Sequence, residues 1–90
     1  MSRKIVGGPM RVGGYNCALL GGDGFYYVTI QDLCGLDDKI IRRHVGECCA
    51  ALGVRPRGRG IYECGNGDVI VGVSMVAAGV MCAESLYNQG

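Results

Sequence analysis

Short runs of apolar residues fill much of the chain, and two glycine-rich tetrapeptides separate pairs of such runs. These are Gly21-Gly22-Asp23-Gly24 and Gly65-Asn66-Gly67-Asp68. Asp-Gly and Asn-Gly pairs adopt the positive φ angles that a tight hairpin turn requires. The flanking runs carry the β-branched and aromatic residues that strands favour. We therefore predict two β-hairpins, with strands over 15–20, 25–30, 60–64 and 69–75.

Between the predicted hairpins, residues 36–52 have the apolar spacing of an amphipathic helix. Its apolar stripe is Ile41, Val45, Cys48 and Leu52, flanked by Ile40 and Cys49, with Lys39, Arg43 and Glu47 on the opposite side. Asp37 is suited to cap the amino end, and Gly53 followed by Pro56 is a stop signal. One face of this helix should pack on a sheet.

The end of the chain has a second helical pattern. Val76, Val80, Ala83 and Tyr87 recur at helical spacing, which predicts a helix over 76–87. A short strand near residues 4–6 could precede the first hairpin. The prediction is a single α+β domain, 1–90, in the order ββαββα, whose antiparallel sheet is covered by helices on one face.

Composition narrows the class of protein. Of the 90 residues, 49% are hydrophobic and 19% are charged, which excludes a disordered chain and indicates dense burial or a self-associating surface. A formal net charge of +1 gives no general attraction to nucleic acid or anionic membranes. The longest uncharged run, 69–83, is too short for a membrane-spanning helix, and no secretory signal is seen. We expect a water-soluble cytoplasmic protein, with secretion as the alternative.

Six cysteines leave three interpretations open. They are Cys17, Cys34, Cys48, Cys49, Cys64 and Cys82. Because the chain has no export signal and is rich in core-forming residues, reduced thiols are the leading prediction. Three disulfides would fit a secreted protein, and metal ligation is the third interpretation.

His44 and Cys48 are four residues apart on the predicted helix, so both side chains could face one ion. Cys49 with Cys34 or Cys64 could complete a zinc site, but no C-x-x-C pair accompanies them. The same two residues could form a Cys–His nucleophilic pair, which requires an exposed thiolate. Since Cys48 lies on the apolar stripe, we expect core packing, no metal, no cofactor and no catalytic residue.

Three arginines concentrate in one short segment, Arg55, Arg57 and Arg59, interleaved with glycine and proline. Guanidinium groups bind phosphate through two parallel hydrogen bonds, and glycine lets the backbone approach a ligand. Tyr26, Tyr27 or Tyr62 could stack on bases of an RNA. The alternative is a solvated hinge that keeps an apolar protein in solution.

Two segments resemble known families. Residues 17–25 look like the first hairpin of profilin-like and roadblock-like proteins, and this resemblance implies a platform for protein contacts, often dimeric. Residues 47–53 are similar to the paired-cysteine helices of fungal killer-toxin-like secreted proteins. The main hypothesis is a non-catalytic protein-interaction module that self-associates through a sheet edge or an apolar face. The alternatives are a secreted, disulfide-stabilised effector and a protein that binds nucleic acid or phosphate through the arginine segment.

Overall fold

The computed structural model describes residues 4–22, 24–59 and 61–76. Their elements follow in the order β1 (Lys4–Val12), β2 (Tyr15–Gly21), β3 (Tyr26–Ile30), α1 (Asp38–Leu52), β4 (Val54–Pro56), β5 (Tyr62–Gly65) and β6 (Asp68–Met75). The predicted α+β class is confirmed.

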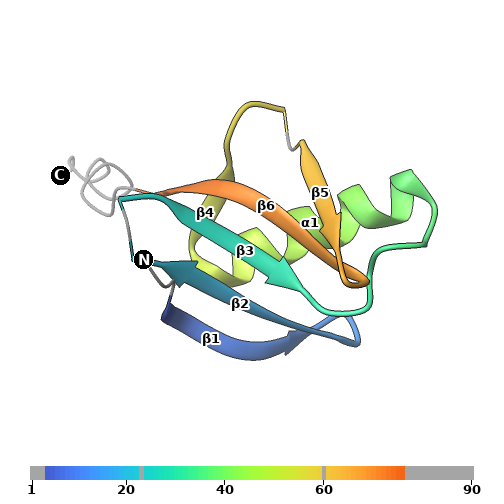
Figure 1. Cartoon of the computed structure of the whole chain (residues 1–90), viewed down its shortest axis with the longest axis horizontal. Helices are drawn as coiled ribbons and strands as arrows, with labels where there is room; N and C mark the ends of the chain where they lie inside the picture. The colour runs from blue at the N-terminus through green and yellow to red at the C-terminus, as the bar shows by residue number, and fades with distance from the viewer. Residues whose placement is uncertain (1–3, 23, 60, 77–90) are drawn as a thin grey trace, which may run out of the picture.

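All strand pairs in the sheet are antiparallel, and β6 is its organising strand. The strand order is β1-β2-β3-β6-β4, with β5 also paired to β6 (Figure 1). The first half of β6 pairs with β5 and its last residues pair with β4, while β3 runs along its other side. Two short strands therefore share one edge of the sheet, and β1 forms the other edge.

The core lies between α1 and one face of the sheet. Figure 1 looks onto the opposite face, with α1 behind the strands. Val28 and Val71, both 0% exposed, pair directly at the centre of the helix-facing side. Across from them, α1 buries Ile41, Val45, Cys48 and Cys49. Each large side chain buried in this way contributes about 1.5–3 kcal/mol relative to exposure.

Both predicted hairpins are confirmed. β2 pairs with β3 and β5 pairs with β6. Asn66 and Gly67 have φ angles of 56° and 85°, the left-handed conformation that the Asn-Gly pair predicted. Asp23 of the first turn lies outside the described residues, and Gly24 beside it has a φ of 91°.

The central helix is confirmed with its caps. Asp37 accepts a hydrogen bond from the Lys39 amide at 3.1 Å, and Gly53 ends the helix with a φ of 76°. The buried face is wider than the predicted stripe, because His44 is only 8% exposed. Its ring packs edge-on against Tyr15 with 5.0 Å between ring centroids, so His44 belongs to the core.

The predicted order ββαββα needs correction, because the described elements follow as βββαβββ. The first strand covers Lys4–Val12 instead of a few residues, since an edge strand tolerates Gly and Pro that would break a central one. β4 replaces part of the predicted arginine loop, because the left-handed turn at Gly53 returns the chain to the end of β6. The helix predicted over 76–87 falls almost wholly on residues outside the described ones.

The prediction of reduced thiols is wrong for two cysteines, because Cys34 and Cys64 form a disulfide. The Cys34 amide donates to the Gly67 carbonyl at 3.1 Å, which places the segment before α1 against the β5–β6 turn. The two Cα atoms are thereby 5.8 Å apart, within the range that a disulfide spans. Cys17, Cys48 and Cys49 are free and buried, so a framework of three disulfides is also wrong. Cys82 lies outside the described residues.

The double substitution Cys34→Ser with Cys64→Ser should lower the free energy of unfolding by about 3–4 kcal/mol, because the bridge closes a loop of 30 residues. Urea unfolding measures the loss. Unmodified protein in reducing buffer should show the same loss, as a control for the substitutions themselves. Equal stability of the oxidised and reduced proteins would contradict this expectation.

Candidate functional site

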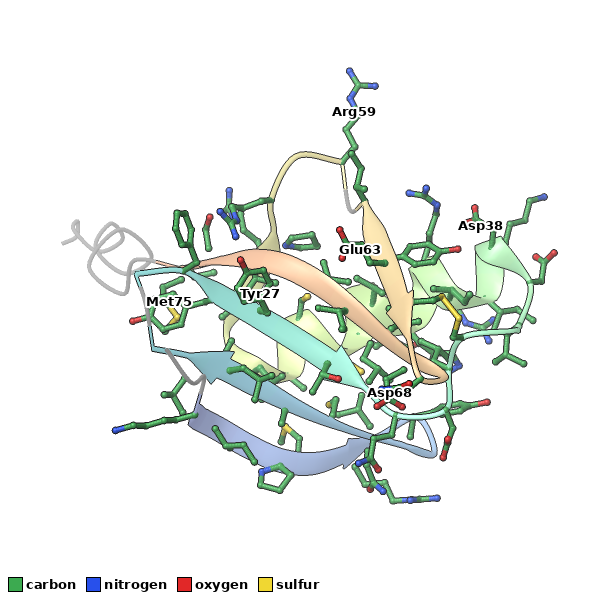
Figure 2. All side chains as sticks on the ribbon, viewed as in Figure 1. Tyr27, Asp38, Arg59, Glu63, Asp68 and Met75 are labelled. Atoms are coloured by element: carbon green, nitrogen blue, oxygen red, sulfur yellow. A yellow bond between two sulfur atoms is a disulfide. The ribbon has the colours of Figure 1, made fainter. Side chains whose placement is uncertain are left out.

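The face of the sheet opposite α1 carries apolar and aromatic side chains. Alternation along the strands puts Leu20, Tyr27 and Ile70 on this face, since their neighbours Leu19, Val28 and Val71 point into the core. These three are half-buried by their neighbours, whereas Ile5 on β1 is 56% exposed. Figure 2 shows Tyr27 on the viewer's side of β3. We refer to Ile5, Ala18, Leu20, Tyr27, Thr29, Ile70 and Gly72 as the helix-free face.

Arg57 folds onto one end of the helix-free face. Its amide donates to the Gly72 carbonyl at 2.9 Å, and a Cβ atom added at Gly72 would lie 2.9 Å from a guanidinium nitrogen of Arg57. The absence of a side chain at Gly72 therefore makes room for the arginine. Its guanidinium carbon is 5.3 Å from the ring centroid of Phe25 and 5.9 Å from that of Tyr27, which are cation–π distances.

A shallow apolar groove runs between β1 and β3 on this face. Ile5, Pro9, Ala18, Leu20 and Thr29 line it, and its volume is about 180 Å³. Small-molecule sites typically measure about 300–1,000 Å³, so the groove is smaller than such sites.

Polar side chains close one end of the groove. Asn16 donates to Gln31 at 3.4 Å and accepts from Arg11 at 3.3 Å. The groove is thus apolar along its length and polar at its end.

A second concavity lies between α1 and the chain that follows β4. We call it the arginine pocket; Arg42, Arg55 and Arg59 line it, with Val45, Gly46, Pro56 and Gly58. Its volume is about 390 Å³, and no acidic residue is among those that line it. The arginines come from a helix and from the segment after it, so the fold brings them together.

Arg42 is held at the pocket by a hydrogen-bond network. Its Nε donates to Asp38 at 2.9 Å, and its Nη1 donates to the Arg59 carbonyl at 3.3 Å. The Tyr62 hydroxyl also donates to Asp38, at 2.7 Å. These hydrogen bonds from Tyr62 and Arg42 hold the pKa of Asp38 below its usual value, and the same carboxylate raises the pKa of Tyr62.

The structure divides the binding residues predicted from the sequence among separate places. Arg55 and Arg59 line the arginine pocket, but Arg57 lies on the helix-free face. Tyr62 is bound to Asp38 next to Arg42, and Tyr26 packs over Gly21, where an added Cβ would be 2.8 Å from its ring. Of these five residues, Arg55, Arg59 and Tyr62 thus lie around Arg42, whereas Arg57 and Tyr26 lie elsewhere.

Sequence reasoning missed Arg42 and Gly46 in the pocket and Phe25 beside Arg57. The helical spacing of four residues between Arg42 and Gly46 was a usable signal, since it puts both on one side of α1. No local signal indicated that Phe25 would meet Arg57.

The buried thiols form a cluster whose environment opposes reactivity. Burial, together with the neighbouring Cys17, raises the pKa of Cys48 to about 12, and burial raises the pKa of Cys49 to about 11. A thiol acts as a nucleophile only when ionised. The geometry therefore argues against the Cys–His pair of His44 and Cys48.

Within residues 4–22, 24–59 and 61–76, no three His, Cys, Asp or Glu side chains are grouped to hold a metal ion. The Cys34–Cys64 disulfide also removes two of the ligands considered for zinc. In the same part of the chain, no helix has both the length and the apolar character needed to cross a membrane.

No protein-family model, curated protein or solved structure matches this chain. The resemblance to profilin-like and roadblock-like proteins stays a prediction.

Because of the buried thiols, the free energy of unfolding should vary with pH in the alkaline range. The pKa of Cys48 is raised from 9.0 to about 12 on folding and that of Cys49 to about 11, so the folded state keeps protons that the unfolded state releases. The free energy of unfolding should be constant below about pH 9 and should fall above it, by at most about 1.4 kcal/mol per pH unit for each thiol.

Urea unfolding between pH 8 and pH 10.5 measures this slope. Cys48→Ala should make this slope less steep, and Cys49→Ala should reduce it further. An unchanged slope in the double variant would assign the alkaline effect to other groups.

Proposed function

We propose that this protein is an interaction module that forms a homodimer by packing the helix-free face against the same face of a second copy. The observation that carries the proposal is that, among the described residues, a helix covers one face of the sheet and none covers the other. α1 lies against one face, whereas apolar and aromatic side chains populate the other. Apolar area of this kind gains free energy when it leaves water.

The sheet edges are poorly suited to association. β1 contains Pro9, which has no amide to donate, and its pairing with β2 is interrupted twice by register shifts. The other edge consists of two short strands, β4 with three residues and β5 with four. Irregular and short edges are the usual protection against edge-to-edge pairing. The sequence suggested self-association through a sheet edge or through an apolar face, and we therefore favour the apolar face.

The helix-free face extends across the width of the sheet. Strands lie about 4.8 Å apart and rise about 3.3 Å per residue, so five strand positions of about seven residues span roughly 550 Å² in projection. Side chains roughen the surface and increase its accessible area beyond the projection. A standard interface buries about 800 Å² per partner, so a dimer would need the whole face together with exposed side chains at its border, such as Phe25.

A second copy is the partner that fits the charge and shape of this face. The face carries both signs of charge, because Glu63 on β5 opposes Ile70 while Arg57 lies over Gly72. A net charge of +1 creates little repulsion between copies. Face-to-face sheets pack about 10 Å apart, and a two-fold axis makes one patch serve both partners. Each copy could insert a side chain into the groove of the other.

The Cys34–Cys64 disulfide fits either a cytoplasmic or a secreted protein, so both locations stay predictions. The proposed dimer does not depend on either location. The disulfide joins the segment before α1 to β5, and neither of its cysteines lines the groove.

The substitution Ile70→Lys should weaken the dimer by roughly tenfold or more, because a charged ammonium would have to lose water in the interface. In the monomer the new side chain can pair with Glu63 across the strands, so folding should persist. Analytical ultracentrifugation at high micromolar concentration measures association, and urea unfolding checks the fold.

Ile40→Lys is the matched control, since Ile40 is 37% exposed and lies on α1, on the other side of the sheet. Its association should equal that of the unmodified chain. Leu20→Lys on β2 repeats the test from another strand. A clean monomer of the unmodified chain at high micromolar concentration would rule the proposal out.

A further inference from the structure

The arginine pocket concentrates positive charge in a nearly neutral protein. Three of its seven lining residues are arginines, whereas the whole chain has 9 basic and 8 acidic residues. The acidic group tied to the pocket is Asp38, which binds Arg42 from outside the lining. The local balance is therefore positive, although the global charge is close to zero.

Arg55 and Arg59 have no acidic partner among the described residues. The ion pairs in that part of the chain join Arg42 to Asp38 and His44 to Glu47. Figure 2 shows the Arg59 side chain extending into solvent from the segment before β5. A guanidinium without a partner keeps its donors for a ligand, and its planar fork matches two phosphate oxygens.

The floor of the pocket differs from its charged rim. Pro56 is half-buried and provides apolar surface, whereas Val45 is only 3% exposed and belongs mainly to the core. Gly46 and Gly58 have no side chains there, and a Cβ atom added at either one would meet nothing within 4 Å. The pocket is thus open where Gly46 of α1 has no side chain. Its volume of about 390 Å³ lies within the range of small-molecule sites.

We infer that the arginine pocket binds a phosphate group carried by a small organic molecule, with Arg55 and Arg59 as the anion ligands and Arg42 as the fixed charge beside them. The apolar floor at Pro56 receives the organic part of the ligand. This inference is independent of the proposed dimer, because the residues that line the pocket are not those of the helix-free face.

Substitutions at Gly46 test the site without removing a native contact. Gly46 lies inside α1, where glycine is unfavourable, so Gly46→Glu and Gly46→Gln should both preserve or increase stability. The two side chains have the same size, but only Glu brings a negative charge into the pocket. Nuclear magnetic resonance of the full chain, titrated with adenosine monophosphate or inorganic phosphate, follows the amides of Gly46 and Gly58.

The unmodified chain should show saturable shifts of both amides, and adenosine monophosphate should bind more tightly than inorganic phosphate because of the apolar floor. Gly46→Glu should bind roughly tenfold more weakly than Gly46→Gln, because a like charge beside the anion opposes binding. If both variants lose binding, the ligand is also placed in the pocket, because either long side chain at Gly46 would then block it.

Arg55→Gln combined with Arg59→Gln should abolish saturation, whereas Arg11→Gln on β1 is the control and should leave it unchanged. Unaltered binding in Gly46→Glu, or no saturation in the unmodified chain, would overturn the inference. So would a single-stranded RNA oligomer that binds the Gly46→Glu variant as well as the unmodified chain while the mononucleotide does not bind.

Discussion

The contact between α1 and one face of the sheet is the interaction on which the rest of this structure depends. It buries the valines of β3 and β6 against Ile41, Val45 and the two adjacent free cysteines of the helix. With one helix of 15 residues in the described chain, the core is two layers deep. The same arrangement leaves the other side of the sheet without a covering element among those residues, which creates the helix-free face.

The segment after α1 contributes to two surfaces, although its arginines stand at every second position. Arg55 and Arg59 line the pocket beside the helix, whereas the backbone of Arg57 is hydrogen-bonded to Gly72 and its side chain crosses onto the sheet. Gly72 permits this crossing, since any larger residue would meet the guanidinium. A run of arginines that looks like one site in the sequence is thus split by the fold.

Electrostatics and burial act differently on the two groups of polar side chains near α1. Asp38, Arg42 and Tyr62 are tied together at an exposed end of the helix, where hydrogen bonds favour the carboxylate. Cys48 and Cys49 lie in the apolar layer, where burial favours the neutral thiols. The first group can support recognition of a charged ligand, while the second group packs and stays inert.

Short stretches of the sequence were sufficient to predict local structure: both hairpins, the helix and its caps at Asp37 and Gly53. Turns and caps depend on a few adjacent residues, so their signals are present in short stretches of chain. The packing of the whole domain was needed to show that β4 joins the sheet, that Cys34 meets Cys64, and that Arg42 joins Arg55 and Arg59. Each of these depends on segments far apart in the chain, whose approach is set by how the strands pair and where the helix packs.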